Sequence, residues 1–376
     1  MKLIYLVTQD WYFFSHRLPM ARAAIRAGFD VAVITNVDKH KFAIEEAGVR
    51  VIPFAFDRKS LNPITALLQI SKLIEIYRAE KPDLVHHIAL KPILFGSIAA
   101  MVARVPHVLN AFAGLGVIFH SNIFQARIIR PFLIPAFRFL LKCPGSWLLF
   151  QNKDDRAKME ALGLTTPERT VIIRGSGVDL DHYPVTPMPE QPPFICIFAG
   201  RMIDSKGLPT MQAAFEILEV HAPHIRLWMY GKPDSGNPGS WDQARIHGWD
   251  KNHPTVTWKG HREDMAEIWP LGHVAVLPAW GGEGLPKALL EAAACARPII
   301  ASDVSGCREV VEQGRNGLLV PPGDAEQLAA AILEMSLKPE RCEAMGLESR
   351  KIVEGDLSAE AVSRNTEALY RRIVAA

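Results

Sequence analysis

The sequence predicts an α/β protein built from two doubly wound domains in tandem, and three observations lead to this prediction. Short apolar runs rich in β-branched residues alternate with helix-length amphipathic segments along the 376 residues, a pattern typical of parallel sheets covered on both faces. The alternation stops at residues 184–193, PVTPMPEQPP, and then restarts. Hydrophobic residues make up 49% of the chain and charged residues 22%, which excludes a disordered chain and suffices for two cores.

In the first half, seven segments are predicted as strands: 2–8, 30–35, 49–54, 83–88, 107–112, 146–151 and 170–174. Helical patterns lie between them, for example at 17–27 and 63–78. The start, MKLIYLVTQDW, is too short and too weakly charged for a signal sequence and fits a buried strand. We expect no membrane span, because no window of about 20 residues is sufficiently apolar. The five cysteines form no CxxC pair, so we expect free thiols in a reducing cytosol.

The proline-rich segment is predicted to link the two domains, because five prolines in ten residues fit neither a helix nor a central strand. After it, strands are predicted at 194–200, 225–231, 255–260, 273–279, 298–303 and 317–323, with helices at 208–221, 286–296, 325–336 and 358–374. The predicted domains are therefore 1–185 and 186–357, followed by a C-terminal helix at 358–376. In doubly wound folds ligands bind outside the carboxyl ends of the strands, here in a cleft between the domains.

The formal net charge of +2 hides an asymmetry. Residues 1–185 contain 23 Lys and Arg against 15 Asp and Glu, a net +8, whereas residues 186–376 contain 19 against 25, a net −6. Residues 84–153 contain no Asp or Glu. This asymmetry predicts that one half meets an anionic surface or substrate. We expect no nucleic-acid binding, because the basic residues interleave with aliphatic side chains rather than with stacking aromatics.

The second domain opens with a strand that ends at Gly200 and is followed by Arg201, Lys206 and a helix. Glycine lets the backbone approach a ligand, and the two cations beside a helix N-terminus suit a pyrophosphate. The alternative is two solvated surface cations. The segment is no GxxxxGKS loop, and no GxGxxG follows the first strand, which argues against an ATPase and a dehydrogenase.

A second motif joins Glu283, at the end of a Gly-rich loop, to Glu291 on the helix that follows Pro286. Carboxylates accept hydrogen bonds from adjacent hydroxyl groups, as in a ribose or a hexose. The alternative is a helix-capping Glu283 and a solvated Glu291.

These two motifs, GRMIDSKG (200–207) and GGEGLPKALLEAAACARPIIASDVSGCREVV (281–311), resemble retaining glycosyltransferase family 4 in order and spacing. In the first half, RKSLNP (58–63), DLVHHIALKPILFGSIAA (83–100) and NAFAGLG (110–116) resemble a bacterial subgroup. Its members extend undecaprenyl-diphosphate-linked sugars for surface glycans, such as lipopolysaccharide or capsule, or for protein glycosylation.

The resemblance implies two Rossmann-like domains in the GT-B arrangement, with the donor bound in the second domain and the acceptor in the first. The final helix is expected to return to the first domain. By position, Arg201 and Lys206 would hold the diphosphate, Glu291 the ribose and Glu283 the donor sugar, while Gly260 and its neighbours would lie beside the base. The donor-binding residues are thus expected to be Gly200, Arg201, Lys206, His261, Arg262, Glu283, Gly284, Leu285, Pro286 and Glu291.

The expected mechanism follows from charge flow, because breaking the glycosyl–diphosphate bond leaves negative charge that Arg201 and Lys206 could stabilise. The sequence has no DxD motif before a sheet edge, so we expect no metal and no cofactor. In this family retention is explained by front-face attack, so Glu283 is not expected to act as a covalent nucleophile. The expected catalytic residues are Glu283, His86, Arg201 and Lys206.

In the first half, His86 and His87 end the strand DLVHHI, and Lys91 follows. Adjacent strand residues face opposite ways, so one histidine packs in the core. We favour His86 for the acceptor proton or the donor sugar, with a core-packed histidine as the alternative. The expected acceptor-binding residues are Asp10, Trp11, His16, Arg17, His87, Lys91, Arg127 and Arg130. The loop holding Asp10 and Trp11 lacks the glycines common in the family.

Residues 122–142, NIFQARIIRPFLIPAFRFLLK, mix apolar and basic side chains. A basic amphipathic helix binds an anionic membrane surface, with about 1 kcal/mol from each basic residue. The alternative is a core helix with a basic outer face, and Pro131 and Pro135 are expected to break or kink it. We expect a cytoplasmic enzyme, peripheral on the inner face of the cytoplasmic membrane.

The leading hypothesis is a retaining, metal-independent transferase that moves a hexose or N-acetylhexosamine from a nucleotide sugar, with UDP favoured by the resemblance, to a polyprenyl-diphosphate glycan. One alternative is a nucleotide-sugar epimerase of the same shape, which would convert the donor without an acceptor. The other is a non-catalytic protein that binds sugar nucleotides.

Overall fold

The computed structural model describes residues 1–56, 62–115 and 124–376, with the side chains of 124–129 and 132 excepted. The chain divides into a first unit, Met1–Ser176 with Ala359–Ala376, and a second unit, Gly177–Ser358. The proline-rich segment, where the sequence placed the boundary, thus lies within the second unit. Buried Arg297 holds it there, because its guanidinium donates to the carbonyl oxygens of Thr186 and Pro187 and to Thr186 Oγ1.

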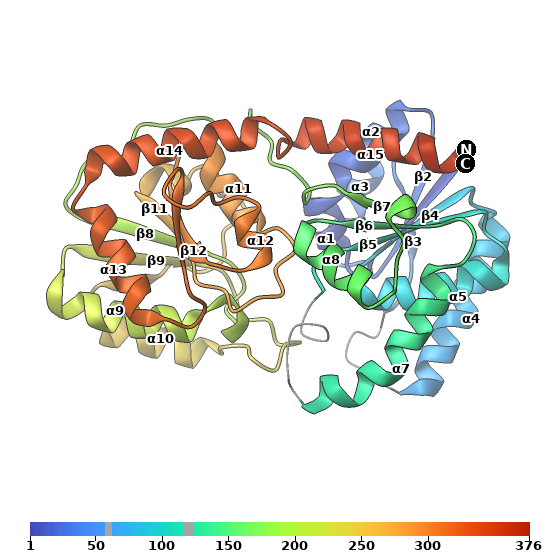
Figure 1. Ribbon diagram of the computed structural model, residues 1–376, viewed down its shortest axis with the longest axis horizontal. Helices are drawn as coiled ribbons and strands as arrows, with labels where there is room; N and C mark the ends of the chain where they lie inside the picture. Colours follow the sequence, from blue (N-terminus) through green and yellow to red (C-terminus); the bar gives the residue numbers. More distant parts are fainter. Residues whose placement is uncertain (57–61, 116–123) are drawn as a thin grey trace. The chain divides into compact units, whose positions relative to one another are not determined.

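The first unit contains a parallel sheet in the order β3-β2-β1-β4-β5-β6-β7 (Figure 1). Its strands are β1 (Lys2–Leu6), β2 (Asp30–Thr35), β3 (Arg50–Pro53), β4 (Leu84–Ile88), β5 (His107–Phe112), β6 (Ser146–Phe150) and β7 (Thr170–Ile172). All seven predicted strands are present. Connections run outward in both directions from the β1/β4 pair, which is the switch point of a doubly wound sheet.

The helices of the first unit cover both faces of this sheet. They are α1 (Asp10–His16), α2 (Leu18–Arg26), α3 (Lys41–Glu46), α4 (Pro63–Glu80), α5 (Leu90–Ala103), α7 (Phe124–Leu141), α8 (Lys153–Ala161) and α15 (Ala359–Val374), with the 3₁₀ turn η1 (Pro167–Arg169). The Asn62 side chain accepts from the Ile64 amide and caps α4 ahead of Pro63. Helix α7 continues through Pro131 and Pro135, so neither proline breaks it as expected.

The alternation of β1 side chains divides the core of the first unit. Leu3 and Tyr5 pack with the apolar faces of α2 and α15, whereas Ile4 and Leu6 pack with α4 and α5. Helix α15 lies along α2 and contributes Leu369 to that core (Figure 1). The final helix of the chain is therefore an integral part of the first unit.

The second unit contains a parallel sheet in the order β10-β9-β8-β11-β12-β13. Its strands are β8 (Phe194–Ala199), β9 (Ile225–Tyr230), β10 (Val256–Trp258), β11 (Val274–Leu277), β12 (Ile299–Ser302) and β13 (Gly317–Val320). The main helices are α9 (Leu208–His221), α10 (Gln243–Asn252), α11 (Lys287–Ala294), α12 (Ser305–Arg308), α13 (Ala325–Ser336) and α14 (Pro339–Glu354), with the 3₁₀ turns η2 (Asp204–Lys206) and η3 (Trp269–Leu271). The prediction of two doubly wound α/β domains is confirmed.

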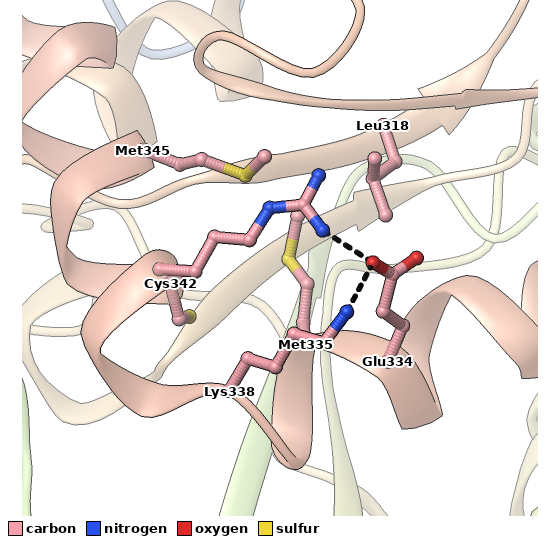
Figure 2. A pocket seen from close by; sticks show the side chains of 7 residues that line it. Leu318, Glu334, Met335, Lys338, Cys342 and Met345 are labelled. Carbon is pink, nitrogen blue, oxygen red and sulfur yellow. Dashed lines mark hydrogen bonds and ion pairs between the residues drawn. The ribbon is translucent and has the colours of Figure 1, made fainter.

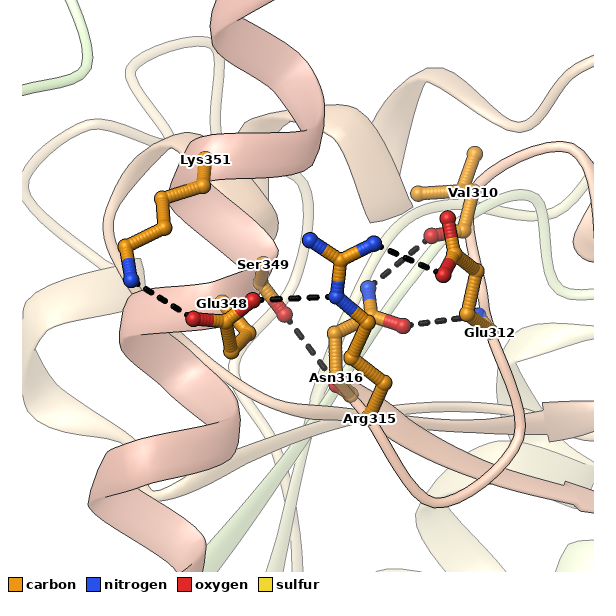
Figure 3. Close-up of polar contacts among 7 residues, drawn as sticks. All are labelled: Val310, Glu312, Arg315, Asn316, Glu348, Ser349 and Lys351. Carbon is orange, nitrogen blue, oxygen red and sulfur yellow. Dashed lines mark hydrogen bonds and ion pairs between the residues drawn. The ribbon is translucent and has the colours of Figure 1, made fainter.

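A polar cluster fastens the turn before β13 to α14 (Figure 3). The Asn316 side chain accepts from the Glu312 amide and donates to the Val310 carbonyl, and its own carbonyl accepts from Ser349 Oγ. Arg315 adds ion pairs with Glu312 and Glu348. Because Asn316 and Ser349 are fully buried, these hydrogen bonds fix the β13 edge of the second sheet to α14.

Candidate functional site

The loop after β8 closely approaches the end of β11. Gly207, the N-cap of α9, has a left-handed φ of +83°, and a Cβ atom there would lie 1.8 Å from the Pro278 carbonyl oxygen. Only glycine fits this contact. The sequence motif Arg201–Gly207 is thereby brought against the loop that carries Glu283.

Lys206 and Glu283 form the central ion pair of this site. Lys206 Nζ lies 2.8 Å from the carboxylate of Glu283, and the two side chains are 14% and 16% exposed. Gly306 of α12 packs closely against the loop that carries Glu283, since a Cβ atom at Gly306 would lie 2.6 Å from the Glu283 carbonyl oxygen. The structure therefore joins residues that the sequence separates by 77 positions.

Arg201 also has a carboxylate partner. Its Nη1 donates to Asp234 Oδ2 at 2.7 Å, and its side chain is 47% exposed. Asp234 belongs to the loop after β9. A hydrogen bond from the Met202 amide to the Lys232 carbonyl holds this loop against the loop that carries Arg201. Both cations expected to hold a diphosphate thus lie at the carboxyl end of the central strand β8, each paired with a carboxylate.

Glu291 projects from α11 and is only 7% exposed. Lys287, one helical turn earlier, places Nζ 3.4 Å from Glu291 Oε1. Burial and the nearby Glu291 charge raise the pKa of the Tyr183 hydroxyl above its ordinary value. The sequence reasoning missed Tyr183, because the residue lies just before the proline-rich segment and belongs to no motif. We expected Pro286 in the first turn of α11. The structure instead makes it the N-cap, one position earlier.

The segment expected beside the nucleotide base follows β10. The Gly260 carbonyl accepts from the Gly231 amide, which fixes this turn beside the end of β9. His261 and Arg262 are both exposed, and Arg262 lies 3.8 Å from Glu267. Desolvation and the charge of Lys232 lower the pKa of His261, which favours a neutral imidazole at neutral pH.

In the first unit, the Asp10 side chain lies in the interior. Its carboxylate is fully buried and accepts from the backbone amides of Trp11, Asp38 and His40, so it holds the loop after β2 to the start of α1. Trp11 is 41% exposed, and His16 stacks on Tyr12 with ring centroids 4.3 Å apart.

The two histidines of β4 both lie in the interior. His87 packs toward α4, with Nε2 against the Tyr77 hydroxyl and Nδ1 against Asn110 Oδ1. His86 points to the opposite face and is 1% exposed, with Nδ1 2.7 Å from the Tyr370 hydroxyl of α15. The two rings point to opposite faces of the sheet, as predicted from strand alternation. Because helices cover both faces, both rings are buried among the described residues.

The remaining residues expected at the acceptor differ in environment. Arg17 is 1% exposed, whereas Lys91 lies over the Phe95 ring at 5.5 Å. Arg130 is half-buried on α7. The side chain of Arg127 lies outside the described residues.

Two cavities lie away from these residues. One, of about 10 Å³, lies between α13 and α14, where Lys338 and Arg341 both contact Glu334 (Figure 2). It has room for a single water molecule and its cations are paired, so we assign it no ligand. A cavity of about 470 Å³ in the first unit is lined by Leu141, Lys142, Leu148, Thr165, Thr166, Glu168 and Arg169.

Comparison with known proteins relates both units to glycosyltransferases. Residues 2–151 match the family described as glycosyl transferase 4-like, and residues 193–337 match glycosyl transferases group 1. The N,N'-diacetylbacillosaminyl-diphospho-undecaprenol alpha-1,3-N-acetylgalactosaminyltransferase of Campylobacter jejuni is 25% identical over 84% of each chain. The capsular polysaccharide biosynthesis glycosyltransferase CapM of Staphylococcus aureus is 23% identical over 98% of this chain and 96% of its own.

Solved structures match over the whole chain. Anabaena HepE, crystallised with UDP and glucose, aligns with a TM-score of 0.79 at 17% identity over 99% of each chain. Sucrose-phosphate synthase from Thermosynechococcus elongatus aligns with a TM-score of 0.81 at 21% identity over 100% of this chain and 99% of its own. The two parallel sheets therefore have the fold of these GT-B glycosyltransferase structures, and the chain is similar to a glycosyl transferase 4-like domain in its first half and to a group 1 domain in its second.

Proposed function

We propose that this protein is a retaining, metal-independent glycosyltransferase that transfers a hexose or N-acetylhexosamine from a UDP-sugar to a polyprenyl-diphosphate-linked glycan. The observation that carries the proposal is the meeting of Lys206 and Glu283 at the carboxyl end of β8, with Arg201 on the same loop. This arrangement offers two cations for a diphosphate and one carboxylate for the hydroxyl groups of the donor sugar.

The existing ion pairs suggest how the donor is received. In the described residues Arg201 and Lys206 already have carboxylate partners, so an incoming diphosphate competes for both cations. Lys206 would move from Glu283 to the diphosphate, which frees the Glu283 carboxylate for the sugar. Glu291, almost enclosed and adjacent to Lys287, is positioned on the next helix for the ribose hydroxyls.

The proposed chemistry places the developing negative charge on the leaving diphosphate, where Arg201 and Lys206 stabilise it. We assign no metal to this step, since the two cations supply the charge that a metal would. His86 and His87 are enclosed, so we leave the acceptor proton to the departing diphosphate oxygen. In retention without a covalent intermediate this oxygen lies on the same face of the sugar as the attacking hydroxyl.

The proposed acceptor and pathway rest on the relatives. The Campylobacter jejuni relative is named for an undecaprenol diphosphate-linked acceptor, and the Staphylococcus aureus relative for capsular polysaccharide biosynthesis. We propose an acceptor of the same chemical class, used in surface polysaccharide or glycoprotein glycan assembly.

A lipid-linked acceptor requires contact with a membrane surface, and we propose that α4 and α7 of the first unit supply it. Helix α4 exposes Ile64, Leu67 and Leu68, each about two-thirds exposed, at spacings of three and four that place them on one face. Helix α7 exposes Phe139 and ends near Lys142. Both helices pack on α5, and an apolar face beside basic residues suits an anionic bilayer.

No helix in the described ranges has both the length and the apolarity to span a bilayer. Because the exposed apolar face of α4 and the end of α7 suit an anionic bilayer, we propose a peripheral protein on the inner face of the cytoplasmic membrane. Sedimentation with liposomes containing anionic lipid tests this. Absence of binding at low salt would refute it.

A donor screen tests the proposed activity. UDP-, GDP- and ADP-linked hexoses and N-acetylhexosamines are incubated with a polyprenyl-diphosphate acceptor extract, and lipid-linked product and free nucleotide are measured. Product formation with a UDP-sugar and no added metal, unchanged by chelator, is expected. Conversion of the donor without acceptor would instead show an epimerase, and binding of UDP without turnover would show a non-catalytic protein. Neither alternative requires the paired Lys206 and Glu283, so the transferase is favoured.

A further inference from the structure

Arg17 is an interior arginine that forms no ion pair with any carboxylate of the described residues. It is 1% exposed and lies between α1 and α2. Its Nη1 donates to the Met20 sulfur at 3.4 Å, a weak contact. Within residues 1–56, 62–115 and 124–376, its Nε and Nη2 have no hydrogen-bond partner.

His86 has a further nitrogen without a hydrogen-bond partner among the described residues, and the charge of the Arg17 guanidinium acts on its ring. Its Nδ1 is bonded to the Tyr370 hydroxyl, which in turn lies 2.7 Å from the Tyr5 hydroxyl. Among the described residues its Nε2 has no partner. Burial and the charge of Arg17 hold the pKa of His86 well below its usual range, so the ring is neutral. When Tyr370 donates to Nδ1, Nε2 carries the proton and is a free donor.

The nearest acid along the chain does not compensate Arg17. The Asp10 carboxylate is held by three backbone amides of the loops that it joins, and no ion pair connects any described carboxylate to Arg17. A guanidinium stays protonated in proteins, and a buried charge without a partner is strongly destabilising. A neutral water would satisfy the N–H groups but would leave the charge uncompensated.

We propose that Arg17 and His86 form an internal binding site for a small inorganic anion, such as chloride or phosphate. The anion accepts from Arg17 Nε and Nη2 and from His86 Nε2. Arg17 and His86 are both 1% exposed, so an anion bound between them is enclosed and must be small. A lipid headgroup is therefore excluded as the ligand. The site lies in the first unit and does not depend on the proposed transferase activity.

The anion site has a structural consequence, because Tyr370 belongs to α15. Tyr370 bonds to His86 from one side while the anion holds His86 and Arg17 from the other. Binding of the anion therefore stabilises the attachment of the last helix to the first unit. By linkage, an anion that binds only the folded state raises the melting temperature in proportion to the logarithm of its concentration.

Thermal unfolding at constant ionic strength tests the proposal. Sodium chloride and sodium phosphate are compared with sodium gluconate, whose anion is too large for an enclosed site. The proteins are wild type, Arg17→Met and Arg22→Met. Arg22 is an exposed arginine on the same helix α2, so its variant controls for the loss of one positive charge.

We expect wild type and Arg22→Met to gain about 4 °C or more in chloride or phosphate, and Arg17→Met to gain nothing. In gluconate Arg17→Met should be at least as stable as wild type, since it removes an uncompensated buried charge. Equal gains in all three proteins, or none in wild type, would overturn the proposal.

Crystals of the wild type soaked in sodium bromide give a second test that needs no variant. The anomalous difference map should show one bromide within hydrogen-bond distance of Arg17 Nη2 and His86 Nε2. A water molecule or an empty space at that position would overturn the proposal, even if Arg17→Met did not fold.

Discussion

Replacing Lys206 with alanine tests the proposed donor site most directly. The substitution removes one of the two cations at the carboxyl end of β8 and leaves the Glu283 carboxylate without its partner at 2.8 Å. Both side chains are about 15% exposed, an environment between that of a surface pair and that of a fully buried pair. The change therefore affects stability as well as catalysis, and each effect has its own magnitude.

For stability, loss of one partner costs about 0–1 kcal/mol at the surface and about 3–5 kcal/mol in the interior. The intermediate exposure of this pair predicts a loss of about 1–3 kcal/mol in the free energy of unfolding. For catalysis, one preorganised contact to a developing charge is worth about 100- to 1,000-fold in turnover. Part of that gain is offset, because Lys206 must first leave Glu283. We therefore expect turnover to fall by at least about tenfold, or about 1.4 kcal/mol.

Initial rates measured over a range of UDP-sugar concentrations, with acceptor in excess, separate kcat from KM. Circular dichroism confirms that the variant is folded at the assay temperature. Lys251→Ala, which removes an exposed lysine of α10, is the matched control and should retain full turnover. The double variant Lys206→Ala/Glu283→Gln should be at least as stable as Lys206→Ala, because it also removes the unpaired charge.

Turnover within about threefold of wild type in folded Lys206→Ala would refute the reasoning, since an energy below about 0.7 kcal/mol is too small for a cation at the leaving group. A rise in KM with unchanged kcat would also contradict it. That result would mean that Lys206 binds ground state and transition state equally.

Four further predictions follow from the described contacts. Glu283→Gln should lower kcat/KM more than it weakens UDP binding measured by calorimetry, since its carboxylate is assigned to the sugar; equal losses in both would contradict that role. Gly306→Ala places a Cβ atom 2.6 Å from the Glu283 carbonyl oxygen and should lower turnover at least about tenfold. The control Gly248→Ala, whose Cβ atom meets nothing within 4 Å, should be active. Full activity in both variants would show that the loop carrying Glu283 is free to move. Lys142→Glu reverses an exposed charge after α7 and should weaken binding to anionic liposomes about tenfold at low salt; unchanged sedimentation would exclude this end of α7 from the contact. The hydrogen bond from Arg50, with a further bond from Lys2, lowers the pKa of Glu80 from 4.5 to about 2. The contribution of Glu80 to the free energy of unfolding is therefore complete above about pH 4.5 and is lost as the pH falls toward 2. In urea unfolding, a difference in this free energy between wild type and Glu80→Gln that stays constant over this range would show that the pair contributes nothing.

Much of the fold could be predicted from the sequence, because parallel strands buried on both faces appear as continuous apolar runs. The proline-rich segment lies within the second unit rather than between the two units. Prolines exclude regular structure there, but they do not reveal that Arg297, more than 100 residues later, holds this segment to the second unit.

Part of the candidate site could be predicted from the sequence motifs. The motifs place Arg201 and Glu283 in the loops that follow β8 and β11, and their proximity follows from the switch point of the sheet. The partners Asp234 and Tyr183 left no signal, because a single acid or tyrosine in a loop is ordinary. His86 and Arg17 illustrate another limit. Tyr370 of α15 covers His86, and strand alternation alone does not show which helix covers a face.

The chain path has a consequence for the order of folding. The first unit is interrupted after Ser176 and completed only by Ala359–Ala376, whose residues Val362, Leu369, Tyr370 and Ile373 fill its core. A ribosome that has released residues 1–176 has therefore delivered a sheet on which one face still lacks the part of its cover that α15 supplies. The second unit is contiguous and can fold as soon as it emerges, whereas the unit made first must wait for the residues made last. Chaperone binding to nascent chains should thus persist on the amino-terminal half until synthesis ends.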